Sequence, residues 1–180
     1  MPNWCDNQIT ITGPNSVIDK IEKIVNDESN NIENGLLQFF HPMPKELMET
    51  EKSSDDKKMN KQPFVDGVNN WYDWRVNNWG TKWELCEFYG VDRQYLTEQS
   101  EGESTISFSF SSAWAPPIGA YEKFLENNSN CFIRAYYYEG GCDFMGLWED
   151  GIDDCYAPSD YKSTDDFWKD GIGSTLDDVF

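Results

Sequence analysis

The sequence predicts an α+β domain in which an antiparallel sheet carries two helices on one face. Apolar and polar residues alternate over residues 8–12 and 105–111, the period of a half-buried strand, and a helical pattern and another apolar run follow each segment. With 38% hydrophobic and 16% aromatic residues, 180 residues suffice for one buried core. These observations favour a single folded domain over a disordered chain.

The first half of the pattern runs from residue 8 to residue 40. After the strand at 8–12, a Gly-Pro-Asn turn leads to Ser16, a candidate helix N-cap. Apolar residues at helical spacing over 17–25 predict an amphipathic helix of about three turns. The short apolar run 36–40 is interpreted as a buried strand.

A long insertion, at about 41–81, separates the two halves. The His-Pro-Met-Pro sequence at 41–44 interrupts regular pairing, and the charged segment 45–62 predicts a mobile excursion with one helical turn near 46–51. A helix is expected from Trp71 to Asn78, with a stop at Gly80 and extended chain from Thr81. Residues 90–103 are interpreted as a polar connection with a helical turn at 92–96.

The second half repeats the first. The strand at 105–111 precedes a helix that opens at Pro116-Pro117, because proline in a first turn loses no helical hydrogen bond. Strands follow at 131–138 and 143–149. Two strand–helix–strand units in succession give the ferredoxin-like split βαβ pattern, so the domain is expected to span residues 1–149, with an acidic C-terminal extension, 150–180, packed on it.

Charge excludes several classes of function. The chain has 33 acidic and 14 basic residues, for a net charge of −19, which disfavours direct binding of nucleic acid or of an anionic membrane. From residue 139 onward there are 12 acidic and 2 basic residues, against 21 and 12 before it. More than half of the excess negative charge therefore lies in less than a quarter of the chain.

No residue pattern indicates catalysis, a cofactor or a bound metal. The five cysteines form no Cys-x-x-Cys pair, and His41 is the single histidine. The aspartates near residue 150 lack the spacing of a calcium-binding loop. The start of the chain has no signal-peptide pattern, and no apolar run is long enough to span a membrane. We therefore expect a non-enzymatic, cytoplasmic protein.

Five motifs together resemble one family. They are Met-Pro-Asn-Trp-Cys-x-Asn at 1–7, His-Pro-Met-Pro-Lys-Glu-Leu at 41–47, Asn-Trp-Gly-Thr-Lys-Trp at 78–83, Ser-Ala-Trp-Ala-Pro-Pro at 112–117, and the 138–146 stretch. This pattern resembles the YubB-like ferredoxin-like domain family of bacteriophages, prophages and conjugative plasmids. The resemblance covers about residues 1–149 and implies the fold and a mobile-element origin, but no reaction.

Two functions remain open. The first is a phage or plasmid accessory protein that binds a basic host protein. Through an acidic surface or as a DNA mimic, it would inhibit a nucleic-acid-directed defence of anti-CRISPR or anti-restriction type. Its expected contacts lie in the acidic extension: Asp150, Asp153, Asp154, Tyr161, Asp165, Asp166, Trp168 and Asp170. The second is a small-ligand or nucleotide-binding protein that uses the sheet face and the tryptophan-rich insertion, although core packing also explains those tryptophans.

Overall fold

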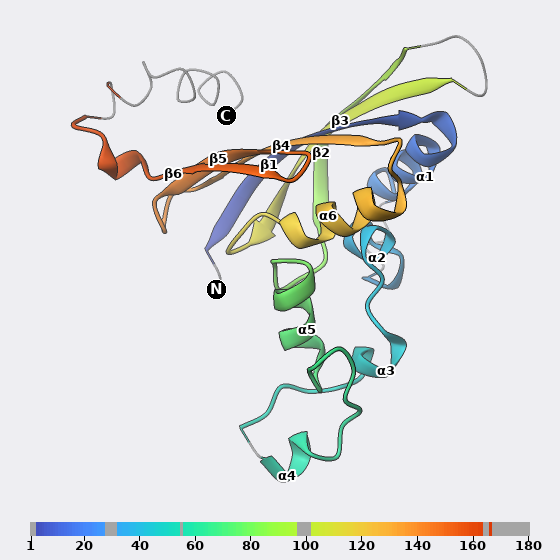
Figure 1. Ribbon diagram of the computed structural model, residues 1–180, viewed down its shortest axis with the longest axis vertical. Coiled ribbons are helices and arrows are strands. Elements are labelled where there is room, and N and C mark those ends of the chain that lie inside the picture. Colours follow the sequence, from blue (N-terminus) through green and yellow to red (C-terminus); the bar gives the residue numbers. More distant parts are fainter. Residues whose placement is uncertain (1–2, 28–31, 55, 97–101, 164–165, 167–180) are drawn as a thin grey trace.

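A six-stranded antiparallel sheet forms the upper layer of the computed structural model in Figure 1. The structure describes residues 3–27, 32–54, 56–96, 102–163 and 166. The strands lie in the order β2-β3-β1-β4-β5-β6, and each pair of neighbours is antiparallel. Their bounds are β1 (Trp4–Pro14), β2 (Cys86–Tyr95), β3 (Glu103–Ala113), β4 (Phe132–Glu139), β5 (Phe144–Glu149) and β6 (Ile152–Tyr156). The predicted α+β class is confirmed.

The helices lie on one side of the sheet in Figure 1. Three of them, α1 (Asn15–Val25), α2 (Leu36–Phe40) and α6 (Ile118–Asn127), form the layer next to the strands. The segment with α3 (Lys45–Met48), α4 (Asp56–Met59) and α5 (Trp71–Asn78) extends away from that layer. Two short 3-10 turns complete the described elements, η1 (Ile32–Asn34) and η2 (Pro158–Asp160).

The core lies between the sheet and its helices because the central strands alternate as predicted. On β1 and β3, the apolar residues face the helices in register, with Ile9 opposite Phe108 and Ile11 opposite Ile106. Serine and threonine take the other face, where Thr10 and Ser107 are joined by a 2.9 Å hydrogen bond. The second face of the sheet is therefore hydroxyl-rich along its central strands.

The helix predicted at 17–25 is present, but its N-cap is not Ser16. The helix begins at Asn15, and the cap position, Pro14, makes no side-chain hydrogen bond. The N–H of Asn15 instead donates to the carbonyl of Gly102 at 2.8 Å. A tertiary contact to the start of β3 thus satisfies one of the free amides at this helix end.

The strand predicted at 36–40 is wrong, because these residues form helix α2. The Glu84 carboxylate accepts the N–H groups of Leu37 at 2.7 Å and Gln38 at 2.8 Å. Acceptors at the first amides of a helix stabilise it. The residue that does so here lies 47 positions away in sequence from Leu37, so no local pattern indicated it.

The polar connection predicted at 90–103 is also wrong over its first part. Residues 90–95 belong to β2, an edge strand that pairs with β3. Register shifts follow Cys86 and Tyr89, and Glu87 and Gly90 both have positive φ, 63° in each case. These irregularities break the period-two alternation by which a strand is identified from sequence.

None of the helices in the described ranges is long and apolar enough to cross a membrane.

Candidate functional site

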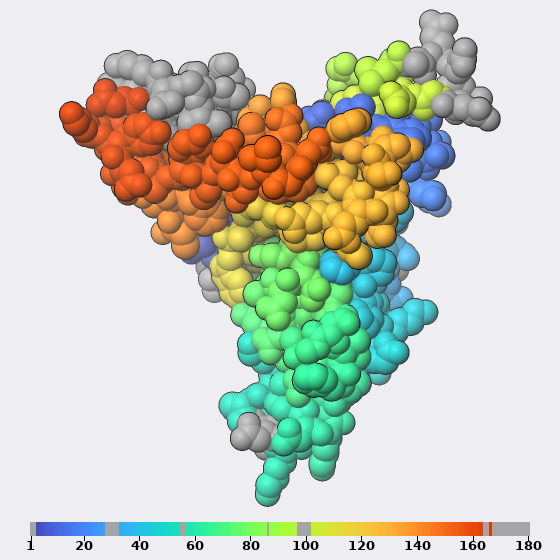
Figure 2. Space-filling view, viewed as in Figure 1, coloured from blue at the N-terminus to red at the C-terminus, as the bar shows by residue number. Residues whose placement is uncertain are grey.

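The acidic segment that follows β5 is part of the sheet. Residues 152–156 form β6, the edge strand beside β5, with Asp154 opposite Leu147 and Asp153 opposite Trp148. Four of the five β6 residues are exposed. In Figures 1 and 2 this segment, coloured orange-red, lies at the end of the sheet away from β2.

Neutral donors orient carboxylates in this segment and in the turn between β4 and β5, where Asp143 lies. Asp153 accepts the hydroxyl of Tyr137 at 2.6 Å, and Asp150 accepts the N–H of Ile133 at 3.0 Å. Asp143 accepts the N–H of Ser159 at 3.3 Å from both carboxylate oxygens. A neutral donor fixes the position of a carboxylate without cancelling its charge, so these side chains present an oriented negative surface.

The Tyr137–Asp153 contact connects this surface to the core. Tyr137 is buried, and desolvation together with the hydrogen bond to Asp153 raises the pKa of its phenol well above the usual range. The phenol therefore stays protonated and donates to Asp153. A methyl group at Gly146 would lie 2.4 Å from the Tyr137 hydroxyl oxygen and 2.5 Å from the Asp154 carbonyl oxygen. The close approach of β6 to Tyr137 thus requires glycine at position 146.

Aromatic side chains lie on the face of the sheet opposite the helices, on the same side as Asp154. Asp153 points to the helix side instead, because it bonds Tyr137 and stands opposite the core residue Trp148. Met145 is buried beneath three tyrosines, Tyr136, Tyr156 and Tyr161. Tyr161, predicted as a contact with a partner, is therefore half-buried against the protein's own sheet. Together with the exposed Ile152 and with Asp150, Asp153 and Asp154, these residues form both sides of the β6 edge, a mixed apolar and acidic surface that we call the β6 face.

The structure brings together some of the predicted contact residues. Asp150, Asp153, Asp154 and Tyr161 all belong to the β6 face or its flanks, and Asp166 is exposed. The others, Asp165, Trp168 and Asp170, lie outside the described residues. Glu149, the last residue of β5, pairs with a cation, since its side chain accepts from Arg134 at 2.6 Å.

The tryptophan-rich insertion contributes to the core, as the packing interpretation predicted. Trp74 and Trp79 are fully buried, with ring centroids 5.9 Å apart, and the indole N–H of Trp79 donates to the carbonyl of His41 at 2.8 Å. Beside this core, Lys82 has its Nζ 4.7 Å from the centroid of Trp83.

His41 packs against the segment around α5. Its Nδ1 lies 3.2 Å from the carbonyl oxygen of Asn78, and its ring contacts Trp74 edge to face at 4.9 Å. Burial lowers the pKa of His41 below its ordinary value. Across the described ranges, no three His, Cys, Asp or Glu side chains gather closely enough to hold a metal ion.

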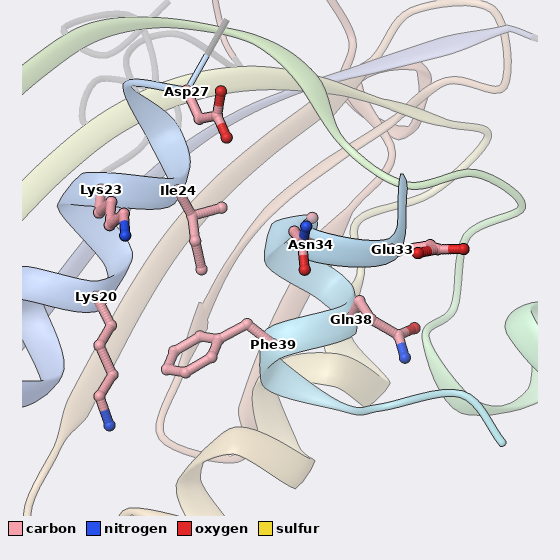
Figure 3. Close-up of a pocket in the computed structure, with 9 residues that line it drawn as sticks. Lys20, Lys23, Ile24, Asp27, Glu33, Asn34, Gln38 and Phe39 are labelled. Atoms are coloured by element: carbon pink, nitrogen blue, oxygen red, sulfur yellow. The ribbon is translucent and has the colours of Figure 1, made fainter. Parts of the chain in front are cut away.

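Two cavities flank α2, and sequence reasoning identified neither. Figure 3 shows one of about 510 Å³ between α1 and α2, where Ile24 and Phe39 lie between the two helices and Lys20 and Lys23 come from α1. The other, of about 320 Å³, is lined by residues of η1, α2, α3 and α5 and by Met43. Its lining residues are Glu33, Gln38, Met43, Met48, Glu49, Trp71 and Arg75.

No protein-family model and no curated protein matches the chain. Among solved structures, the chain is similar to the crystal structure of protein api92 from Yersinia pseudotuberculosis, of the family DUF1281. The identity is 12% and the TM-score 0.45, over 91% of this chain and 97% of that one.

Proposed function

We propose that this protein binds a basic protein partner through the β6 face and that it is not an enzyme. The observation that carries this proposal is the set of carboxylates, Asp143, Asp150 and Asp153, that neutral donors orient at the edge of the sheet. An edge strand with exposed backbone and side chains is open to a partner, and carboxylates beside tyrosines match an interface that combines charge with aromatic anchors.

Inhibition of a nucleic-acid-directed host enzyme is the form of this function that we favour. Duplex DNA presents a negative charge about every 1.7 Å of its axis, so a basic groove built for DNA also attracts a dense row of carboxylates. The net charge of −19 supports such a partner and opposes direct binding of the nucleic acid itself. The expected setting is the cytoplasm of a bacterial host that carries a phage or plasmid.

We further assign the fold to the ferredoxin-like class and the chain to the YubB-like family. The strand order β2-β3-β1-β4 supports the ferredoxin-like class, as do the positions of α1 between β1 and β2 and of α6 between β3 and β4 along the chain. The second is supported by contacts between the motif segments: Trp4 and Trp83 have centroids 5.8 Å apart, and the N–H of Trp114 donates to the carbonyl of Asn3 at 3.0 Å.

Neutralising the β6 face is expected to weaken binding of a basic partner. The test compares the triple variant Asp150→Asn, Asp153→Asn, Asp154→Asn with the native chain, by calorimetric titration with an oligo-arginine peptide. If each exposed charge contributes about 0.5 kcal/mol, the dissociation constant rises about tenfold. Asparagine suits position 150, where φ is 46°, and at position 153 it still accepts the Tyr137 hydroxyl.

A matched control removes three charges elsewhere. The variant Glu46→Gln, Glu51→Gln, Glu122→Gln has the same net charge and changes three exposed residues outside the β6 face. It should bind the peptide within twofold of the native chain. Equal weakening in both variants would show that net charge alone attracts the peptide and would overturn the assignment to this face.

The test of inhibition of a host enzyme requires a purified host partner. A protein captured from host lysate and then purified should bind the native chain, lose affinity for the β6-face variant but not for the control, and be displaced by duplex DNA. The complex should dissociate above a few hundred millimolar salt, because the Debye length falls from about 10 Å at 0.1 M to about 3 Å at 1 M. A complex that duplex DNA does not displace would contradict DNA mimicry.

A further inference from the structure

Arg75 is a buried cation that forms no ion pair with the residues that the structure describes. Its side chain extends from α5, and only 9% of the residue is exposed. Among the described residues, no carboxylate oxygen lies within 4.0 Å of its guanidinium group. Its Nε is buried and has no hydrogen-bond partner there. Because a buried charged donor that lacks a partner is costly, this arrangement needs an explanation.

Aromatic rings hold the guanidinium group in place. Its central carbon lies 5.0 Å from the ring centroid of Trp71 and 4.9 Å from that of Trp79. Contacts of this kind attract the cation but leave its N–H groups without acceptors. The negative charge of the nearby Glu84 carboxylate attracts the guanidinium group. That carboxylate, however, already accepts the backbone N–H groups of Leu37, Gln38 and Leu85. Arg75 is thus fixed in position while hydrogen-bonding capacity remains unused.

Arg75 also lines the 320 Å³ cavity, which lies at the lower end of the volumes typical of small-molecule sites. Met43, Met48 and Trp71 supply apolar wall. The amide of Gln38 is held by the backbone of Met43, with distances of 3.2 Å and 3.4 Å. Two carboxylate side chains, Glu33 and Glu49, line the same cavity. The cavity is therefore lined by one cationic side chain, two carboxylates and apolar side chains.

We propose that this cavity binds a small zwitterion of the amino-acid type, with its carboxylate on Arg75 and its ammonium group toward Glu49 and Glu33. A carboxylate supplies the acceptor that the guanidinium group lacks, and bidentate pairing with arginine is favourable. Glu33 and Glu49 oppose a phosphate dianion, whereas an uncharged apolar molecule leaves Arg75 unpaired. An apolar side chain on the zwitterion fits against the two methionines and Trp71. This site is independent of the β6 face.

The experiment is a calorimetric and thermal-shift titration of the full chain with each of the twenty L-amino acids and with inorganic phosphate. At least one apolar amino acid is expected to bind with a dissociation constant below about 1 mM and to raise the melting temperature. The amine that lacks its carboxylate should bind at least tenfold more weakly. Failure of every amino acid at millimolar concentration, or tighter binding of phosphate, overturns the proposal.

Two variants locate the binding. Met48→Trp fills the cavity without changing Arg75 and should abolish binding, provided that circular dichroism shows a native fold. Glu49→Gln, at an exposed position, should weaken binding of the amino acid about tenfold while leaving its desamino analogue unaffected or tighter. Glu46→Gln, on the same helix but not among the lining residues, is the control and should change nothing. Amino-acid binding that both Met48→Trp and Glu49→Gln leave unchanged overturns this location.

Discussion

Replacing Trp79 with alanine is expected to lower the free energy of unfolding by about 3–5 kcal/mol, the usual cost of removing a buried large aromatic side chain. Trp79 is completely buried. It contacts Trp74 edge to face, holds one side of the Arg75 guanidinium group, and donates its indole N–H to His41. The variant therefore loses packing, a cation–π contact and a hydrogen bond at the junction of α5 with the helical layer.

Urea denaturation followed by circular dichroism measures this loss. Trp79→Phe separates the contributions, since phenylalanine restores most of the apolar volume but leaves the His41 carbonyl without the indole donor. Trp4→Ala is the control, because Trp4 is 47% exposed, and it should cost about 1 kcal/mol or less. If Trp79→Ala is no more destabilising than Trp4→Ala, the insertion does not depend on this tryptophan.

The second large expected effect is loss of stability at alkaline pH. Cys5 is fully buried on β1, and desolvation raises the pKa of its thiol from 9.0 to about 12. Burial likewise raises the pKa of the Cys131 thiol to about 11 and that of the Tyr121 phenol well above its ordinary value. All three groups stay protonated in the folded chain at a pH where the unfolded chain releases its protons.

The direction of the effect follows from this difference. A group whose folded pKa is raised contributes stability that is complete below its unfolded pKa and is lost as the pH rises through its folded pKa. The free energy of unfolding should therefore fall from about pH 9 to pH 12. The Cys5 thiol alone accounts for about 4 kcal/mol over that window, at roughly 1.4 kcal/mol per pH unit.

Urea denaturation at a series of pH values between 7 and 11.5 tests this prediction. Cys5→Ala should flatten the decline, because the variant lacks the thiol that retains its proton on folding. Cys155→Ser changes an exposed cysteine and should leave the pH dependence close to that of the native chain. A free energy of unfolding that stays constant from pH 8 to pH 11.5 would show that the buried thiols do not titrate with unfolding.

The sequence predicted those helices and strands in which the spacing of apolar residues within the element itself indicates its type. The alternation at 8–12 and 105–111 predicted β1 and β3, and the helical spacing at 17–25 predicted α1. The helix expected to open at Pro116-Pro117 is α6, which begins at Ile118. In each case one face of the element is buried, so burial imposes the period that the pattern shows. The helix at 71–78 was predicted as well, and its Asn70 cap accepts the N–H of Asp73.

The pattern failed where a distant residue or an irregular backbone decides the structure. The five-residue run 36–40 is too short to separate a helix from a buried strand, and Glu84, from another part of the chain, accepts the first amides of helix α2. In β2, the positive φ angles of Glu87 and Gly90 interrupt the alternation of apolar and polar residues, so the pattern did not predict this strand. Local propensity is a weak prior, and tertiary contacts override it.

The features of the candidate sites also differ in whether the sequence alone or only the tertiary structure determines them. The sequence determined by itself that the chain is acidic and that this charge is concentrated after residue 139, because charge is a sum over residues and needs no fold. Only the tertiary structure decided that β6 joins the sheet, that Tyr137 orients Asp153, and that Arg75 lies buried beside a cavity. Those features arise from residues on separate elements, and packing alone brings them together.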